Sequence, residues 1–216
     1  MYDFGLGEAK GMLDPTIRAA GEKAFREEAT MYTDPAGIPE LREAVPRWLD
    51  VADRYGPENV VISTGAKQCL FNILLAVCNP ADCVLFDAAP WVSYQPLATA
   101  AYAFPVMVLP LGEKRAQLKV TPNDLRRSLR ARPHAKLFLL NSPVNPTGQL
   151  YTAAELEALL QVCVEHRIYF VLDRRYWRIV FEGQNYPEPR LDDETQPWLV
   201  QVDGMSKNFR RAGGLR

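Results

Sequence analysis

Apolar and polar positions divide the chain into two kinds of segment. In one kind, apolar side chains recur every three or four residues, which predicts amphipathic helices. These segments are residues 15–29, 39–55, 66–78, 94–102, 122–131 and 152–166. Between them lie short, often β-branched apolar runs, which predict strands at residues 60–63, 84–86, 106–109, 137–140, 168–172 and 199–202. Runs that are apolar at every position are typical of parallel strands, so the order predicts an α/β fold with a mostly parallel sheet flanked by helices.

The first part of the chain has a different pattern from the rest. Gly5, Gly7 and Gly11 indicate a loop, and two predicted helices follow on either side of the polar segment 32–37. We therefore expect residues 1–47 to form an N-terminal arm and part of a smaller domain. Residues 48–216 would form a larger domain built on the sheet.

Composition changes this picture little. The 25 Lys and Arg residues balance 26 Asp and Glu residues, so nothing supports nucleic-acid or membrane-surface binding. No segment approaches the ~20 apolar residues that span a bilayer, and the N-terminus lacks the pattern of a secretory signal. The four cysteines, Cys69, Cys78, Cys83 and Cys163, have no metal-binding spacing. We expect free thiols in a cytoplasmic protein, with no metal site.

Residues suited to chemistry follow the predicted strands. In a parallel sheet the ligand crevice lies beyond the carboxyl ends of the strands. The residues in these places are Gly65-Ala66-Lys67, Trp91, Asn145, Asp173 and Lys207. Their shared position predicts a ligand site at one edge of the sheet.

Each of these segments also has a plainer interpretation. The turn at Gly65 opens a helix whose N-terminus suits a phosphate, although such turns are common in α/β proteins. Trp91 is either a core residue or a stacking surface for a planar ligand. Asn145 begins an Asn-Pro-Thr-Gly turn, which is either a plain turn or a rigid support for the Asn145 amide, and the bond to Pro146 is a candidate for the cis form.

Two charged residues leave similar alternatives open. Asp173 follows a buried run and needs a positive partner, which is either a protonated ring nitrogen or one of Arg174 and Arg175. Lys207 is either a surface residue or a nucleophile whose pKa nearby positive charge lowers. The arginines that follow it, Arg210, Arg211 and Arg216, supply that charge and possible phosphate contacts.

In their joint order these segments resemble the class I and II aminotransferases of pyridoxal phosphate (PLP) fold type I, which are aspartate aminotransferase-like. The resemblance covers essentially all 216 residues. It rests on Gly5-Leu6-Gly7-Glu8, Tyr32 with Gly37-Ile38-Pro39-Glu40-Leu41-Arg42, Thr64-Gly65-Ala66-Lys67-Gln68, Trp91-Val92-Ser93-Tyr94, Asn145-Pro146-Thr147-Gly148, Asp173 with Tyr176, and Ser206-Lys207.

The resemblance implies PLP as the cofactor and catalytic roles for three residues. Lys207 would form a Schiff base with the cofactor and move the substrate's α-proton. Asp173 would pair with the pyridinium nitrogen, so that the ring draws electrons from the substrate. Tyr176 would hydrogen-bond, together with Asn145, to the phenolic oxygen.

The other contacts are implied in the same way. Trp91 would stack on the ring, while Ser206 and the turn Gly65-Ala66-Lys67 would contact the cofactor and its phosphate. Tyr32 would reach the phosphate of a neighbouring subunit, which implies a homodimer. Gly7 would lie in a loop over the substrate, to which Asn145 would also bind. The implied reaction transfers an amino group between an L-amino acid and a 2-oxo acid by a ping-pong mechanism.

The chain departs from the family pattern at two positions. Arg174 stands where an acid is common, and Leu215 stands where a phosphate-binding arginine is usual. We expect Arg216 to bind the phosphate, with Arg210 and Arg211 as alternatives. Family members are about twice as long, so the chain is interpreted as lacking a C-terminal part. A carbon–sulfur lyase of the same fold and a truncated, non-catalytic ligand-binding homologue remain alternative functions.

Overall fold

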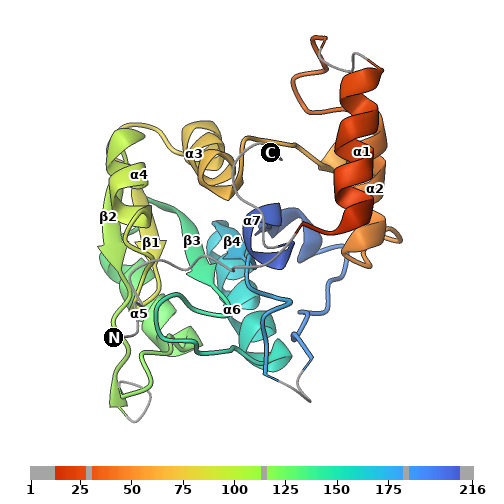
Figure 1. The fold of residues 1–216 in the computed structure, drawn as a ribbon. Helices are drawn as coiled ribbons and strands as arrows, with labels where there is room; N and C mark the ends of the chain where they lie inside the picture. Colours follow the sequence, from red (N-terminus) through yellow and green to blue (C-terminus); the bar gives the residue numbers. More distant parts are fainter. Residues whose placement is uncertain (1–12, 28–30, 113–115, 182–184, 210–216) are drawn as a thin grey trace, which may run out of the picture. The chain divides into compact units, whose positions relative to one another are not determined.

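The computed structural model describes residues 13–27, 31–112, 116–181 and 185–209 (Figure 1). The chain forms two compact units. One falls within Met1–Cys69 and Met205–Arg216, and the other is Leu70–Gly204. The division expected between residues 47 and 48 stays a prediction about domains. No helix among the described residues is long and apolar enough to cross a membrane.

The unit Leu70–Gly204 is built on a five-stranded parallel sheet in the order β2-β1-β3-β4-β5. The strands are β1 (Cys83–Phe86), β2 (Phe104–Met107), β3 (Ala135–Asn141), β4 (Tyr169–Asp173) and β5 (Leu199–Val202). All five lie at or close to the predicted runs, and the predicted α/β fold is confirmed. In the register of the central strands, Asn141 of β3 pairs with Asp173 of β4. The last residues of these two strands are therefore neighbours.

Helices follow the strands in this unit, as the spacing predicts. They are α4 (Tyr94–Ala100), α5 (Pro122–Ala131) and α6 (Ala153–His166), preceded by α3 (Ala66–Val77), which begins in the other unit. The helices α5 and α6 both start with a capping box, from Thr121 with Asp124 and from Thr152 with Glu155. Such a box satisfies backbone N–H groups that the helix itself leaves unpaired. The caps explain why these two helices begin within a residue of their predicted starts.

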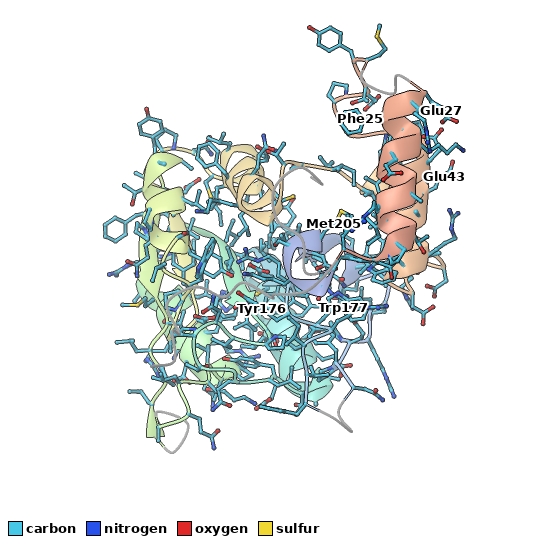
Figure 2. The ribbon with its side chains drawn as sticks, viewed as in Figure 1. Phe25, Glu27, Glu43, Tyr176, Trp177 and Met205 are labelled. Carbon is cyan, nitrogen blue, oxygen red and sulfur yellow. The ribbon has the colours of Figure 1, made fainter. Side chains whose placement is uncertain are left out.

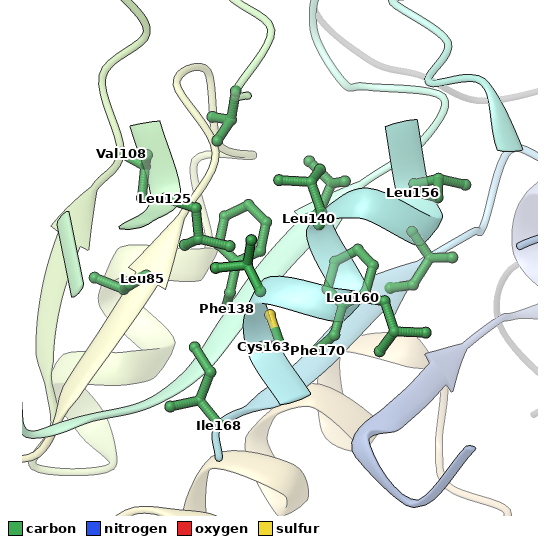
Figure 3. Packing of buried hydrophobic residues seen from close by; sticks show 14 of the residues in the cluster. Leu85, Val108, Leu125, Phe138, Leu140, Leu156, Leu160, Cys163, Ile168 and Phe170 are labelled. Atoms are coloured by element: carbon green, nitrogen blue, oxygen red, sulfur yellow. The ribbon is translucent and has the colours of Figure 1, made fainter. Parts of the chain in front are cut away.

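The hydrophobic core lies between the sheet and the helices α5 and α6 (Figure 3). Phe138 of β3 and Phe170 of β4 stack with ring centroids 5.7 Å apart, and Leu160 of α6 belongs to the same cluster. On β1, Phe86 stacks on Tyr94 of α4 at 5.9 Å. Because every residue of β1 is buried, its apolar run reads as continuous rather than alternating. The core thus extends along β3 and β4 as far as Leu140 and Leu172, next to the carboxyl ends of these strands.

The other unit contains the helices α1 (Pro15–Arg26) and α2 (Pro39–Trp48), the 3-10 turn η1 (Pro57–Asn59) and α7 (Met205–Asn208). Before α2 the chain turns at Gly37, whose φ of +109° suits glycine. A Cβ at this position would lie 2.6 Å from Cγ1 of Ile62. The turn and the segment around Ile62 therefore approach one another in a way that only glycine permits.

One predicted strand was wrong. Residues 60–63 form no strand, although their apolar, β-branched side chains indicated one. The Ile62 N–H donates to the carbonyl of Ala36 at 2.8 Å, and the Val60 carbonyl accepts from Nε of Arg42 at 3.0 Å. The backbone of this segment is thus paired with a turn and a side chain instead of a neighbouring strand. Consequently the Gly65 turn follows an extended loop, not a strand.

Candidate functional site

A buried carboxylate marks the carboxyl end of β4. Asp173 is fully buried, and its backbone carbonyl accepts a 2.8 Å hydrogen bond from the side-chain amide of Asn141 on β3. The Asn141 backbone N–H in turn donates to Oδ2 of Asp87, the residue that follows β1. Three neighbouring strands therefore bring polar side chains to one edge of the sheet, as the parallel topology requires.

Tyr94 of α4 is the first partner of this carboxylate. Its hydroxyl donates to Oδ2 of Asp173 at 2.7 Å, and both side chains are buried. Burial, and then the negative charge of Asp173, raise the pKa of Tyr94 well above its usual value. The hydroxyl therefore keeps its proton and acts as a donor to the carboxylate.

Arg175 is the second partner. Its Nε donates to both oxygens of Asp173 at 3.0 Å, and Nη2 lies 2.9 Å from Oδ2. The guanidinium also lies over the ring of Trp91, 4.5 Å from the ring centroid. Burial disfavours the charged form of Arg175, but the charge and hydrogen bond of Asp173, together with Tyr94 and Tyr176, outweigh this effect and raise the pKa of Arg175. Arg175 is therefore a buried cation held between a carboxylate and an indole ring.

Asn145 and Tyr176 form a pair beside this group. The side-chain amide of Asn145 donates to the Tyr176 hydroxyl at 3.0 Å, and the Asn145 backbone N–H donates to Oδ1 of Asn141 at 2.7 Å. The bond from Asn145 to Pro146 is cis, as predicted, and so is the bond before Pro143. Tyr176 lies in the loop that follows β4, next to Trp177 (Figure 2). The two residues expected to share one cofactor oxygen thus contact each other directly.

The neighbouring arginine has a separate set of contacts. The guanidinium of Arg174 is fully buried and pairs with both carboxylate oxygens of Glu188 through Nη1 and Nη2. Its Nη1 also donates to Oε1 of Gln201 on β5 at 2.7 Å. The rings of Trp177 and Tyr186 each lie 5.0 Å from the guanidinium carbon. Of the two arginines left open as partners of Asp173, Arg175 takes that place and Arg174 does not.

Asp87, Asn141 and Tyr94 were not assigned to the site from the sequence. Burial raises the pKa of Asp87 to about 6, the N–H groups of Asn141 and Ala89 oppose this rise, and the charge of Asp173 adds to it. A usable signal was present for Asp87, because it directly follows an apolar run just as Asp173 does. The same signal was present for Asn141, which directly follows the run 137–140. Tyr94 gave no such signal, since its part in the site depends on helix–strand packing.

The other expected site residues lie in the unit that contains α1, α2 and α7. Gly65 has a φ of +87° and directly precedes α3, which begins at Ala66, while Lys67 is exposed. Within the same turn, the Gln68 side chain accepts from the Thr64 backbone N–H at 2.7 Å. The short helix α7 carries Ser206 and Lys207, both half-buried. Their roles stay predictions.

Tyr32 also belongs to this unit, and its side chain is fully exposed. Gly7 and Arg216 lie outside the described residues, as do the alternative phosphate ligands Arg210 and Arg211. For these four residues the sequence-based expectation stands alone.

The cofactor implied by the resemblance can be tested against this geometry. A buried carboxylate held by Tyr94 and an amide–phenol pair are groups of the kind that a pyridinium ring and its phenolic oxygen require. However, the carboxylate of Asp173 and the face of Trp91 are both in contact with Arg175. The donor set suits the ring, but the ring does not fit while Arg175 keeps these contacts.

Comparisons with known proteins agree on one family. The family model for aminotransferases of class I and II matches residues 1–215. An aspartate/prephenate aminotransferase of Cereibacter sphaeroides is 36% identical, over 97% of this chain and 52% of that protein. An aspartate aminotransferase of Geobacillus stearothermophilus is 32% identical, over 97% and 53% respectively.

Solved structures give the same result. The aspartate aminotransferase from Rhizobium meliloti superimposes with a TM-score of 0.87 and 28% identity, covering 97% of this chain and 52% of that one. The chain therefore spans about half the length of the relatives it matches.

Proposed function

The chain belongs to the class I and II aminotransferase family, and from this premise we propose that it is the N-terminal and central part of a PLP-dependent aminotransferase. The whole protein would exchange an amino group between an L-amino acid and a 2-oxo acid in a ping-pong reaction. The curated relatives described above are named as aminotransferases, which favours this reaction over a lyase of the same fold.

One observation in the structure carries the proposal. A buried carboxylate, Asp173, lies at the carboxyl end of a central parallel strand, where ligands of α/β proteins bind. Burying a carboxylate is costly unless a cation meets it, and in this structure the cation is Arg175. A site that retains such a carboxylate beside an amide–phenol pair is suited to a protonated heteroaromatic ring with an adjacent oxygen.

The residues of this chain would hold and orient the cofactor. PLP supplies an electron sink when it is bound. Tyr94 would keep the Asp173 carboxylate in position by donating its hydroxyl hydrogen to Oδ2. Asn145 and Tyr176 would bind the phenolic oxygen, and Lys207 would be the point of covalent attachment. The turn at Gly65-Ala66-Lys67, together with Ser206 and Arg216, would contact the phosphate, and Gly7 would lie near the substrate.

The assembly is part of the same proposal. Tyr32 is a large aromatic side chain that is fully exposed in this chain. Its exposure supports the role implied by the resemblance, in which it reaches the phosphate site of a second copy in a homodimer. A cytoplasmic location fits the four free thiols.

Covalent trapping tests the proposal directly. The 216-residue chain is incubated with PLP, reduced with borohydride and mapped by peptide mass spectrometry. We expect a stable pyridoxyl adduct on Lys207 that is lost in Lys207→Ala. Lys136→Ala, which removes an exposed lysine from β3, serves as the matched control and keeps the adduct. A folded chain that forms no adduct on Lys207 at saturating PLP would contradict the proposal.

A further inference from the structure

We infer that Arg175 occupies the position of the cofactor ring, so that a pyridine ring binds to Asp173 and Trp91 only after the Arg175 side chain has been displaced. The inference rests on the proposed function for the identity of the ring. It adds that a side chain of the site itself, Arg175, competes with the ring for these contacts.

The guanidinium of Arg175 shares the chemistry of a protonated pyridine. Both are planar cations, both donate N–H groups to a carboxylate, and both stack on aromatic faces. In this structure the guanidinium makes both contacts at once, with Asp173 on one side and with Trp91 at 4.5 Å on the other. Arg175 therefore satisfies the two groups that the ring would otherwise satisfy.

The carboxylate has no acceptor capacity to spare. An ionised carboxylate offers about four lone-pair directions. Oδ1 accepts from the backbone N–H and the Nε of Arg175, and Oδ2 accepts from Tyr94 and from the same Nε, with Nη2 close by. A ring N–H can therefore join Asp173 only where Arg175 gives up its side-chain contacts.

The face of Trp91 is limited in the same way. Stacked aromatic groups have centroid separations of about 4.5–7 Å, which leaves room for a single layer. The guanidinium already lies within that layer. Tyr94 meets Trp91 at 5.6 Å with the two rings nearly perpendicular, so these two rings do not stack on one another. Arg175 is thus the group that competes with the ring for this surface.

Displacement is possible because one cation replaces another. The ring nitrogen would take over the charge pairing with Asp173, and the long Arg175 side chain, 8% exposed in the structure, would move to solvent. A ligand whose binding-competent state is only partly populated binds with an affinity reduced by that fraction. Removing the Arg175 side chain should therefore tighten ring binding.

Pyridoxine 5′-phosphate is the probe that isolates this effect. It carries the ring and the phosphate but no aldehyde, so it cannot react with Lys207. Binding is measured by isothermal titration calorimetry for the wild-type chain, Arg175→Ala and Arg178→Ala. Arg178→Ala is the matched control, because it removes an exposed positive charge three residues away and outside the Asp173 contacts. We expect Arg175→Ala to bind at least tenfold more tightly than the other two.

The same Kd in all three proteins, or undetectable binding in all three, would overturn the inference. Circular dichroism verifies that each variant is folded. Arg175→Lys provides a second variant, since it keeps a charge next to Asp173 but has no planar fork. Its affinity should fall between those of the wild type and Arg175→Ala, and an affinity equal to that of the wild type would count against the inference.

PLP trapping separates this inference from the proposed function. A gain in pyridoxine phosphate affinity without a Lys207 adduct would support the role of Arg175 and contradict the aminotransferase proposal. Equal affinities with a normal Lys207 adduct would do the reverse. If both ideas hold, Arg175→Ala forms the adduct at a lower PLP concentration than the wild type does.

Discussion

The two arginines that follow β4 are adjacent in sequence and differ in the partners they hold. Arg174 is fully buried between Trp177 and Tyr186, and it pairs with Glu188, whose side chain is 41% exposed, and with Gln201. Arg175 pairs with the fully buried Asp173 and covers one face of Trp91. Both residues are buried cations with a carboxylate and an aromatic surface.

The difference lies in what each carboxylate could otherwise bind. The Glu188 carboxylate is partly exposed, so water can solvate it without Arg174. The contacts of Arg174 are therefore structural and join the loop after β4 to β5. Asp173 has no access to solvent and depends on a positive partner. The two ion pairs therefore differ in the solvation of the carboxylate, which is partly exposed in Glu188 and fully buried in Asp173.

The largest loss of stability is expected at Asp173, whose buried carboxylate depends most on a charged partner. Asp173→Asn should leave Arg175 as an unpaired buried cation and lower the free energy of unfolding by about 4 kcal/mol. The double variant Asp173→Asn/Arg175→Met should recover at least half of this loss, because both charges are then gone. Urea unfolding of the single and double variants measures both values. Additive losses would show that the two side chains are not coupled.

Truncating the other arginine should act through packing. Arg174→Ala removes a side chain that contacts two rings, Glu188 and Gln201, and we expect a loss of about 3 kcal/mol from the cavity and the unpaired groups. Because no buried carboxylate is left behind, pairing with Glu188→Gln should recover little. Thermal unfolding of the two variants and their combination tests this contrast. A recovery of stability as large as that in Asp173→Asn/Arg175→Met would show that the two ion pairs behave alike.

Asp87 interacts with Asp173, the partner of Arg175, and gives a prediction for how the stability of the chain depends on pH. Its pKa in the folded chain is about 6, above the ordinary value, chiefly because of burial. The folded state therefore binds a proton more tightly than the unfolded state, and the stability from Asp87 is complete below about pH 4. It is lost as the pH rises through 6, which amounts to about 2–3 kcal/mol.

Asp87→Asn removes this proton-linked contribution. Relative to the variant, the wild type should lose about 2–3 kcal/mol of stability between pH 4 and pH 7. Urea unfolding of both proteins at several pH values measures the difference, and other carboxylates cancel in it. Parallel stability curves for the two proteins would show that Asp87 does not titrate in this range.

The smallest effect is expected at the exposed end of the Arg174 cluster. Glu188→Gln keeps the shape of the side chain and a hydrogen-bonding oxygen for Arg174, but it leaves the fully buried guanidinium without an ion partner, so we expect a loss of about 1–2 kcal/mol. Burial raises the pKa of Glu188, and Arg174 opposes this rise. Chemical denaturation of the variant at neutral pH gives the value. A loss near 3 kcal/mol would place Glu188 with Asp173 as a carboxylate that must be paired.

Much of the fold was predictable because it depends on local patterns. Continuous apolar runs gave the parallel strands, and helical spacing with capping residues such as Thr121 and Thr152 gave the helix starts. The failure at residues 60–63 has a physical reason. An apolar run has the same appearance whether its backbone pairs with a strand or, as here, with the turn at Ala36 and the side chain of Arg42.

The candidate site was likewise predictable in part, where short sequence motifs identify its residues. Asp173, Asn145 and Tyr176 were assigned from short motifs, and the structure brings them to one edge of the sheet within the unit Leu70–Gly204. Tyr94 was missed because it joins the site through the packing of α4, and the pairing of Asn141 with Asp173 depends on the register of β3 with β4. No local pattern contains that information.

The sequence by itself determined the family, the parallel α/β architecture and the need of Asp173 for a positive partner. Each of these follows from residue order, apolar periodicity or the cost of burying a charge. Only the tertiary structure decided which cation meets that need. Arg174 and Arg175 are chemically identical and adjacent, and packing alone directs one toward Glu188 and the other toward Asp173 and Trp91.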